Sequence, residues 1–190
     1  GLEQPQFATG HYSPEDNPEA VAGAVIQFMH DIYKPNTFTK ILFTDFQGGL
    51  ERFTGKNDHC SHDPDMGALR IRPGIQPHTG AVQRRTMDLS RAEELKVAFR
   101  FLSRGLEAGA EVLVDLWNGT SWVKLLELEL RTGRGTGDFS NGSTDYGYLR
   151  VGRDEVRFSP QARIRFRCRS KSPQGSLFIK DVGIYTRSRP

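Results

Sequence analysis

The most informative segment of this chain is Ala162-Arg163-Ile164-Arg165-Phe166-Arg167-Cys168-Arg169. Its period is two, because arginine alternates with apolar residues. Only a β-strand places alternate side chains on opposite faces, so the segment predicts a strand with one face in a hydrophobic core. Guanidiniums that share a face repel each other unless solvent, cross-strand carboxylates or an anionic ligand screens them. The row Arg163, Arg165, Arg167 and Arg169 is therefore the first candidate for a binding surface.

The β pattern continues through most of the chain after Pro35. Residues 95–101 alternate cleanly, and residues 111–117 and 122–130 flank Asn118-Gly119, a dipeptide typical of tight hairpins. We count about eight or nine such segments at irregular spacing, which is typical of two-sheet folds. The sequence predicts an all-β fold, a two-sheet antiparallel jelly-roll sandwich with one N-terminal helix.

The N-terminal region, residues 1–38, has a different pattern. Capping residues and prolines at 13–19 mark a helix start. Four apolar side chains then recur on one helical stripe: Val21, Val25, Phe28 and Ile32. We expect an N-terminal extension with a helix from about 18 to 33, followed by a β-jelly-roll domain at 39–190. The stripe packs either on that domain or on a protein partner or neighbouring domain.

Charge is unevenly distributed although the net charge is only +3. Residues 151–190 contain ten Lys or Arg and three acidic residues. This excess forms either a solvated face or a surface for an anionic polysaccharide or phosphate polymer. Nucleic acid is disfavoured, because the chain has no zinc finger, helix-turn-helix or RNA-binding motif. No apolar run is long enough to insert into a membrane.

Two cysteines allow one disulfide. Cys60 lies in a polar loop and Cys168 on the apolar face of the arginine strand. Either they form a bridge, as in secreted proteins, or they are two free thiols in a reducing compartment. Asn118 and Asn141 begin N-glycosylation sequons in predicted turns, which also favours an extracellular location.

Catalytic motifs are missing from the sequence. It has no Gly-x-Ser-x-Gly elbow, His-Glu-x-x-His helix or phosphate-binding glycine loop. We therefore expect a protein that is not an enzyme. A polysaccharide lyase, with an arginine neutralising a uronate, is the enzymatic alternative.

Five motifs in order resemble a known fold family. They are 43–50 (Phe-Thr-Asp-Phe-Gln-Gly-Gly-Leu), 67–71 (Gly-Ala-Leu-Arg-Ile), the hairpin 118–125, the arginine strand, and 178–184 (Phe-Ile-Lys-Asp-Val-Gly-Ile). Residues 40–186 are similar to MAM-type jelly rolls and to the related calcium-bearing carbohydrate-binding modules. The resemblance implies a non-catalytic extracellular module for adhesion or assembly within a larger surface or secreted protein. The alternative that it implies is a carbohydrate-binding module, here for an acidic or sulfated glycan.

The resemblance also implies a calcium ion where the first and last strands meet, held by Asp45 and Asp181. Gln47 and the acidic loop with Asp58 could add oxygen ligands. The alternative is that Asp45 and Asp181 only cap turns. Zinc at His59, Cys60 and His62 is disfavoured, because no fourth ligand lies at a suitable spacing.

Aromatic residues near the hairpin are candidates for stacking on sugar rings. Trp117 and Trp122 lie on opposite arms, and we expect one ring inside and one outside. The resemblance makes Trp122 the core residue and Trp117 the platform. Tyr146 and Tyr148 could join Trp117 on the binding surface, beside the arginine row.

Overall fold

The computed structural model describes residues 10–12, 38–50, 52–55, 59–73, 81–83, 85–131 and 137–188; of residues 10–12, 82 and 83 it describes the backbone only. Within these ranges the chain is built from antiparallel strands, as predicted. The predicted helix at 18–33 lies outside the described residues. In the described part of the chain, no helix is long and apolar enough to cross a membrane.

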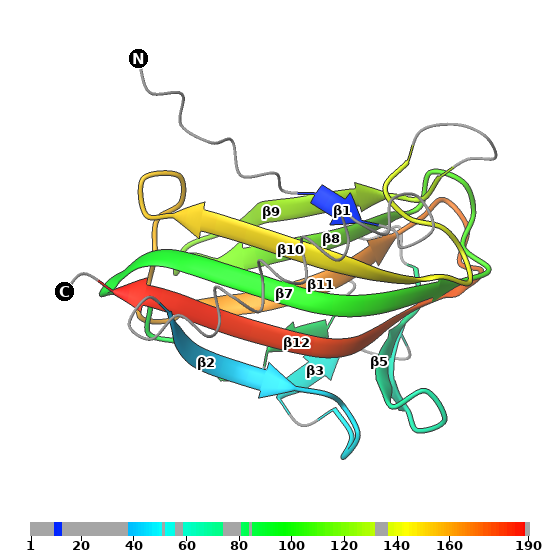
Figure 1. Ribbon diagram of the computed structural model, residues 1–190, viewed down its shortest axis with the longest axis horizontal. Coiled ribbons are helices and arrows are strands. Elements are labelled where there is room, and N and C mark those ends of the chain that lie inside the picture. Colours follow the sequence, from blue (N-terminus) through cyan, green and yellow to red (C-terminus); the bar gives the residue numbers. More distant parts are fainter. Residues whose placement is uncertain are drawn as a thin grey trace.

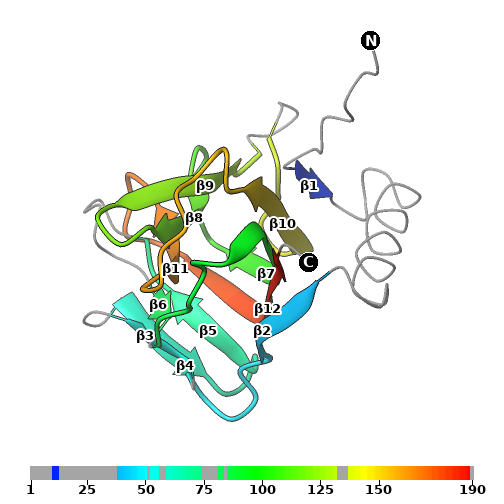
Figure 2. The same cartoon turned by 90° about the vertical axis from the view of Figure 1, so that its left-hand side faces the viewer.

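Two sheets pack face to face (Figure 1; Figure 2 shows the layers end-on). The seven-stranded sheet contains, in spatial order, β1 (Gly10–Tyr12), β10 (Thr144–Gly152), β7 (Ala92–Arg104), β12 (Ser176–Ser188), β5 (Ala68–Ile71) and β4 (Cys60–Asp63), with β2 (Thr39–Thr44) also paired to β12. The five-stranded sheet contains β3 (Phe53–Gly55), β6 (Ala81–Gln83), β11 (Arg163–Arg169), β8 (Glu111–Trp117) and β9 (Trp122–Glu129). The predicted two-sheet sandwich is confirmed.

The first and last long strands of the sandwich lie side by side. β2 runs antiparallel to β12, with Thr44 opposite Val182 and Leu42 opposite Ile184. The short strand β1 comes from the region predicted to precede the domain, and it pairs with the far edge at β10. The seven-stranded sheet is therefore completed by N-terminal segments at two places.

The core lies between the sheets and has phenylalanine at its centre. A continuous series of ring contacts, with centroids 5.0–5.8 Å apart, joins Phe46, Phe53, Phe166, Phe99, Phe101 and Phe139. Five of these six side chains have no exposed surface between the sheets: Phe46, Phe53, Phe101, Phe139 and Phe166. β11 supplies Ile164, Phe166 and Cys168 to this core, which is the inward face that its alternation predicts. The arginines of β11 therefore lie on the outer face of the five-stranded sheet.

Candidate functional site

The arginine row of β11 lies beside β8, and the register of the two strands determines which residue faces each arginine. Across the strands, Arg163 lies opposite Trp117, Arg165 opposite Asp115 and Arg169 opposite Glu111. Residues directly opposite each other in an antiparallel pair share a face, so these side chains meet on the outside of the five-stranded sheet. Two of the three partners are carboxylates.

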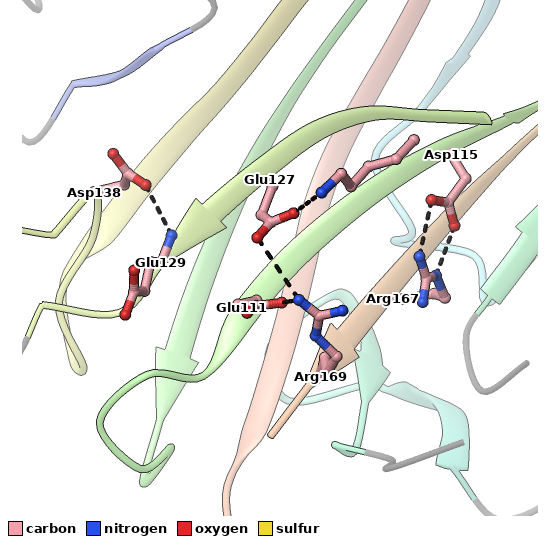
Figure 3. Close-up of polar contacts among 8 residues, drawn as sticks. Glu111, Asp115, Glu127, Glu129, Asp138, Arg167 and Arg169 are labelled. Carbon is pink, nitrogen blue, oxygen red and sulfur yellow. Dashed lines mark hydrogen bonds and ion pairs between the residues drawn. The ribbon is translucent and has the colours of Figure 1, made fainter. Parts of the chain in front are cut away.

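Asp115 pairs with both arginines at the centre of the row. Its carboxylate accepts a 2.9 Å hydrogen bond from Nε of Arg165 and two bonds from Arg167, at 2.6 Å to Oδ2 and 2.9 Å to Oδ1 (Figure 3 shows the Arg167 pair). Asp115 is 1% exposed and Arg165 6%. Burial lowers the pKa of Arg165, and the Asp115 charge opposes that effect. This cluster is a fixed structural element, because each buried charge has a partner of opposite sign.

The far end of the row is also balanced. Arg169 pairs with Glu111 and, at 3.6 Å, with Glu127, which also contacts Lys124 (Figure 3). These groups are more exposed than Asp115, so each pair contributes little to stability. The arginine row is thus screened mainly by cross-strand carboxylates. Arg163 is the exception: it has no ion pair among the residues that the structure describes.

Trp117 and Trp122 lie next to Arg163. They are directly opposite each other at the end of the β8–β9 hairpin, with ring centroids 5.6 Å apart and planes at 57°. The Arg165 guanidinium lies 4.1 Å from the Trp122 ring centroid, which is a cation–π contact. Asp115 therefore holds Arg165, and Arg165 in turn supports Trp122.

The predicted division of the two tryptophans is wrong. Trp122 is half-buried on the outer face, as Trp117 is, and does not belong to the core. The prediction treated the two tryptophans as if they lay on one continuous strand, where residues five positions apart point to opposite faces. Across a hairpin the register decides the face, and directly paired residues lie on the same side.

The hairpin turn fixes that register. The Asn118 side-chain oxygen accepts hydrogen bonds from the backbone N–H groups of Thr120 and Ser121, at 3.0 and 2.9 Å. Gly119 has φ +98°, a left-handed conformation that favours glycine, and a Cβ there would lie 2.6 Å from Oγ of Ser159. The Asn-Gly pair thus brings the two tryptophan rings together.

A pocket of about 210 Å³ opens beside the tryptophan pair. Its lining combines two aromatic rings, a guanidinium, an amide and a hydroxyl: Trp117, Trp122, Arg163, Gln161 and Thr86. Trp122, Gln161, Thr86 and Asp115 were not among the predicted ligand-binding residues. The period-two spacing of Asp115 and Trp117 in β8 could have indicated that both face the arginine row.

The two predicted tyrosines belong to another surface. Tyr146 and Tyr148 lie on β10 in the seven-stranded sheet, whereas Trp117 and the arginines lie in the five-stranded sheet. The core separates the two outer faces. The prediction that these tyrosines join the tryptophan surface is therefore wrong.

The predicted calcium ligands are only partly close in space. The register of β2 with β12 places Asp45, just beyond Thr44, near Asp181. However, Asp181 forms an ion pair with Nε of Arg100 at 2.6 Å, and Asp45 accepts the Gln47 backbone N–H at 3.1 Å. Asp58 lies outside the described residues.

These donors do not fit a calcium ion as they stand. A calcium ion needs six to eight oxygen ligands, and a guanidinium already neutralises the Asp181 carboxylate. Over the described ranges, no group of three or more His, Cys, Asp or Glu side chains could hold a metal ion. Calcium stays a prediction, and we base no function on it.

The predicted disulfide is wrong, because both cysteines are free thiols. Cys60 lies in β4 at the edge of the seven-stranded sheet, and Cys168 points into the core from β11 of the other sheet. Burial raises the pKa of Cys60 to about 11 and that of Cys168 to about 12, so both are protonated at neutral pH.

The two sequon asparagines have structural roles in loops. Asn118 forms the hairpin turn described above. The Asn141 side chain accepts the Leu106 N–H at 3.1 Å and donates to the Leu106 carbonyl at 2.8 Å. Glycosylation at either position stays a prediction.

Comparison with known proteins identifies the fold. No protein-family model matches the chain, and no curated protein sequence does either. Three similar solved structures each share 8–13% of residues with it. The CBM22-1 xylan-binding domain of Paenibacillus barcinonensis Xyn10C has a TM-score of 0.56 at 8% identity, covering 82% of this chain and 99% of that one. The xylan-binding module CBM15 has a TM-score of 0.55 at 13% identity, with the same coverage.

The third neighbour is an adhesin. The K3 cleaved adhesin domain of Lys-gingipain from Porphyromonas gingivalis has a TM-score of 0.53 at 11% identity, covering 78% of this chain and 98% of that one. At such identities the likeness shows the fold alone. The chain therefore shares its β-sandwich fold with carbohydrate-binding modules and with an adhesin domain.

Proposed function

We propose that this chain is a non-catalytic carbohydrate-binding module that holds a polysaccharide on the outer face of the five-stranded sheet. The observation that carries the proposal is the paired arrangement of Trp117 and Trp122 beside a pocket with polar groups. Indole rings stack on the apolar faces of pyranose rings, while amide, hydroxyl and guanidinium groups bond the sugar hydroxyls. Two neighbours of the same fold are named as xylan-binding, which supports a polysaccharide ligand.

The ion pairs of this face argue against a highly sulfated polymer. Asp115, Glu111 and Glu127 neutralise most of the arginine row and would repel closely spaced sulfates. A chain that is mostly uncharged fits the face better. A sulfated glycan, predicted from the sequence as one alternative, is for this reason not part of the proposal.

The binding face is tested with single substitutions and a panel of soluble polysaccharides (xylan, glucuronoxylan, mannan, mixed-linkage glucan and heparin). We expect wild-type protein to bind at least one of the uncharged or sparsely charged polymers in affinity gel electrophoresis and calorimetry. Trp117→Ala and Trp122→Ala should each weaken that binding at least tenfold, because each removes a stacking surface. Tyr146→Ala is the matched control, since it removes an exposed aromatic ring from the other sheet.

Two results would contradict the proposal. One is the absence of binding to every polysaccharide in the panel. The other is loss of binding in Tyr146→Ala with none in the two tryptophan variants. Circular dichroism of each variant checks that the sandwich is intact.

Adhesion or assembly within a larger extracellular protein is a second candidate. The likeness to an adhesin domain favours it. The helix through which we expected a partner to dock lies outside the described residues. A pull-down with the wild-type chain distinguishes the two candidates. Capture of a protein partner that carries no glycan, without binding to any polysaccharide of the panel, would favour adhesion or assembly.

A further inference from the structure

Arg163 differs from the other three arginines of β11. Arg165 and Arg167 share Asp115, and Arg169 pairs with Glu111 and Glu127. Arg163 lies opposite Trp117, whereas each of the other three arginines lies opposite or beside a carboxylate. Within the described residues, Arg163 has no ion pair. Its guanidinium is thus the one in this row whose charge is left for a ligand.

The pocket places suitable groups around that guanidinium. Gln161 and Thr86 line it together with Arg163, and the two tryptophan rings form the rest of its wall. An arginine binds a carboxylate through two parallel N–H···O bonds, and an amide N–H or hydroxyl can donate to the remaining lone pairs. The rings at the same site supply the apolar surface against which a sugar ring packs.

We infer that this pocket selects a sugar residue that bears a carboxylate, such as a uronic acid, within a polysaccharide that is otherwise largely uncharged. The inference rests on the proposed function and specifies its ligand. The guanidinium of Arg163 holds the carboxylate, and Trp117 and Trp122 contact the ring of the same sugar or its neighbour. One carboxylate is recognised and a polyanion is not, because the next three arginines already have acidic partners.

Arg163 is half-buried, which determines how much selectivity it can give. In a partly desolvated pocket a charge-assisted bond is stronger than one in open solvent, and an uncharged analogue leaves the guanidinium without its acceptor. We expect the carboxylated ligand to bind about tenfold more tightly than its uncharged counterpart.

The experiment compares one polymer with its own reduced form. Glucuronoxylan is one ligand, and the same glucuronoxylan after reduction of its carboxylates to alcohols is the other. Affinities are measured by calorimetry for wild type, Arg163→Gln and Arg169→Gln. Arg169→Gln is the matched control, because it removes a guanidinium from the same strand outside the pocket, where it is paired and half-exposed.

We expect wild type and Arg169→Gln to prefer the carboxylated polymer about tenfold. Arg163→Gln should bind both forms with equal affinity, no more tightly than wild type binds the reduced form. Arg163→Lys should recover only part of the preference, because an ammonium cannot form the two parallel bonds.

The outcomes separate the two proposals. Equal wild-type binding of both forms would overturn this inference and leave the proposed function intact. A preference that survives Arg163→Gln would also overturn it, since the carboxylate would then bind elsewhere. Failure of wild type to bind either form, or any other polysaccharide of the panel, would overturn the proposed function itself.

Discussion

Each of the two sheets holds a buried carboxylate between two arginines on its outer face. On the five-stranded sheet this carboxylate is Asp115, and both arginines, Arg165 and Arg167, come from the adjacent strand β11. The two arginines occupy alternate positions of one strand, so they form a compact cluster with Asp115. The side chains of the two arginines are 7% and 12% exposed, so this cluster is nearly as buried as the core.

On the seven-stranded sheet the corresponding carboxylate is Glu94, which is 5% exposed. Its arginines come from both sides: Arg150 of β10 bonds it at 2.9 Å, and Arg187 of β12 at 2.6 Å. The side chains of Arg150 and Arg187 are 22% and 44% exposed. The Glu94 cluster therefore joins three strands across the sheet.

The surroundings of the two clusters differ more than the clusters do. Next to Asp115 lie two tryptophans, a pocket and Arg163, which has no ion pair within the described ranges. Near Glu94 lies Lys96, which has no exposed surface and whose ammonium is 4.2 Å from the Phe38 ring centroid. The comparison indicates that a buried carboxylate between two arginines stabilises the fold on either sheet, and that the proposed binding site depends on the groups beside the Asp115 cluster.

The largest effect should come from removing the central carboxylates. Asp115→Asn leaves two nearly buried guanidiniums and should lower the free energy of unfolding by about 3 kcal/mol. Glu94→Gln should cost less, about 2 kcal/mol, because the Arg187 side chain is 44% exposed and stays partly solvated. Urea unfolding measures both. Only Asp115→Asn should also weaken polysaccharide binding, because only Asp115 positions the arginine that supports Trp122.

The control for both is Asp181→Asn. It breaks the Arg100–Asp181 pair, whose side chains are 42% and 30% exposed, and should cost less than about 1 kcal/mol. If Asp181→Asn destabilised the protein as much as Asp115→Asn, burial would not be what distinguishes these pairs. Equal loss of binding in Glu94→Gln would remove the functional difference between the two faces.

A smaller effect is expected when one arginine of the buried cluster is replaced. Arg165→Met leaves Asp115 bonded twice by Arg167 but removes the cation from the Trp122 ring. The free energy of unfolding should fall by about 2 kcal/mol, and tryptophan fluorescence should change because the indole surroundings change.

The matched substitution on the other face is Arg100→Met. It should cost less than about 1 kcal/mol and leave the fluorescence unchanged, because Arg100 pairs with a half-exposed carboxylate and contacts no tryptophan. Unchanged fluorescence in Arg165→Met would show that the guanidinium does not determine the position of Trp122.

Sequence alone predicted much of this fold, because some of its elements are determined by local patterns of residues. Alternation in β11 and the Asn-Gly turn are local signals, and they correctly gave a strand with Phe166 inside and a hairpin at Asn118. The pairing of β2 with β12 came from the family resemblance. The irregular strand order was not predictable residue by residue, because it depends on contacts between segments far apart in the chain.

The site was predicted less well, because it depends on register. Tyr148 and Trp117 look alike in the sequence, yet they lie on opposite sheets. The sequence leaves a bridge between Cys60 and Cys168 open, and only the structure shows that both are free thiols. The partner of each arginine is likewise set by cross-strand register, so the sequence showed four equivalent guanidiniums where the structure has three paired ones and Arg163.

The cysteines give a pH test of the two sheets, since each sheet contains one. Burial, with a further contribution from Glu111, raises the pKa of Cys168 from 9.0 to about 12. The folded state then keeps a proton that the unfolded state loses. This stabilisation is fully present below pH 9 and is lost as pH rises from 9 to 12, by about 1 kcal/mol per pH unit.

The measurement is the slope of unfolding free energy against pH between 9 and 12. Cys168→Ala should make the slope shallower, and Cys60→Ala should do so over a narrower range, because the pKa of Cys60 is raised only to about 11. Iodoacetamide should also modify Cys60 faster than Cys168, which is 1% exposed. Identical slopes in wild type and Cys168→Ala would mean that folding does not raise the pKa of the Cys168 thiol.

The smallest effects should come from the two loop asparagines, and these separate stability from binding. Asn118→Ala removes the bonds that close the hairpin, and Asn141→Ala removes the pair of bonds to Leu106. Each should cost about 0.5–1 kcal/mol, because both sites are partly solvated. Asn118→Ala should also weaken polysaccharide binding a few-fold, since it loosens the turn that aligns the tryptophan rings, whereas Asn141→Ala should leave binding unchanged. Equal binding by the two variants at equal stability would mean that the hairpin turn does not set the ring geometry, and the alignment would then have to come from the Arg165 contact alone.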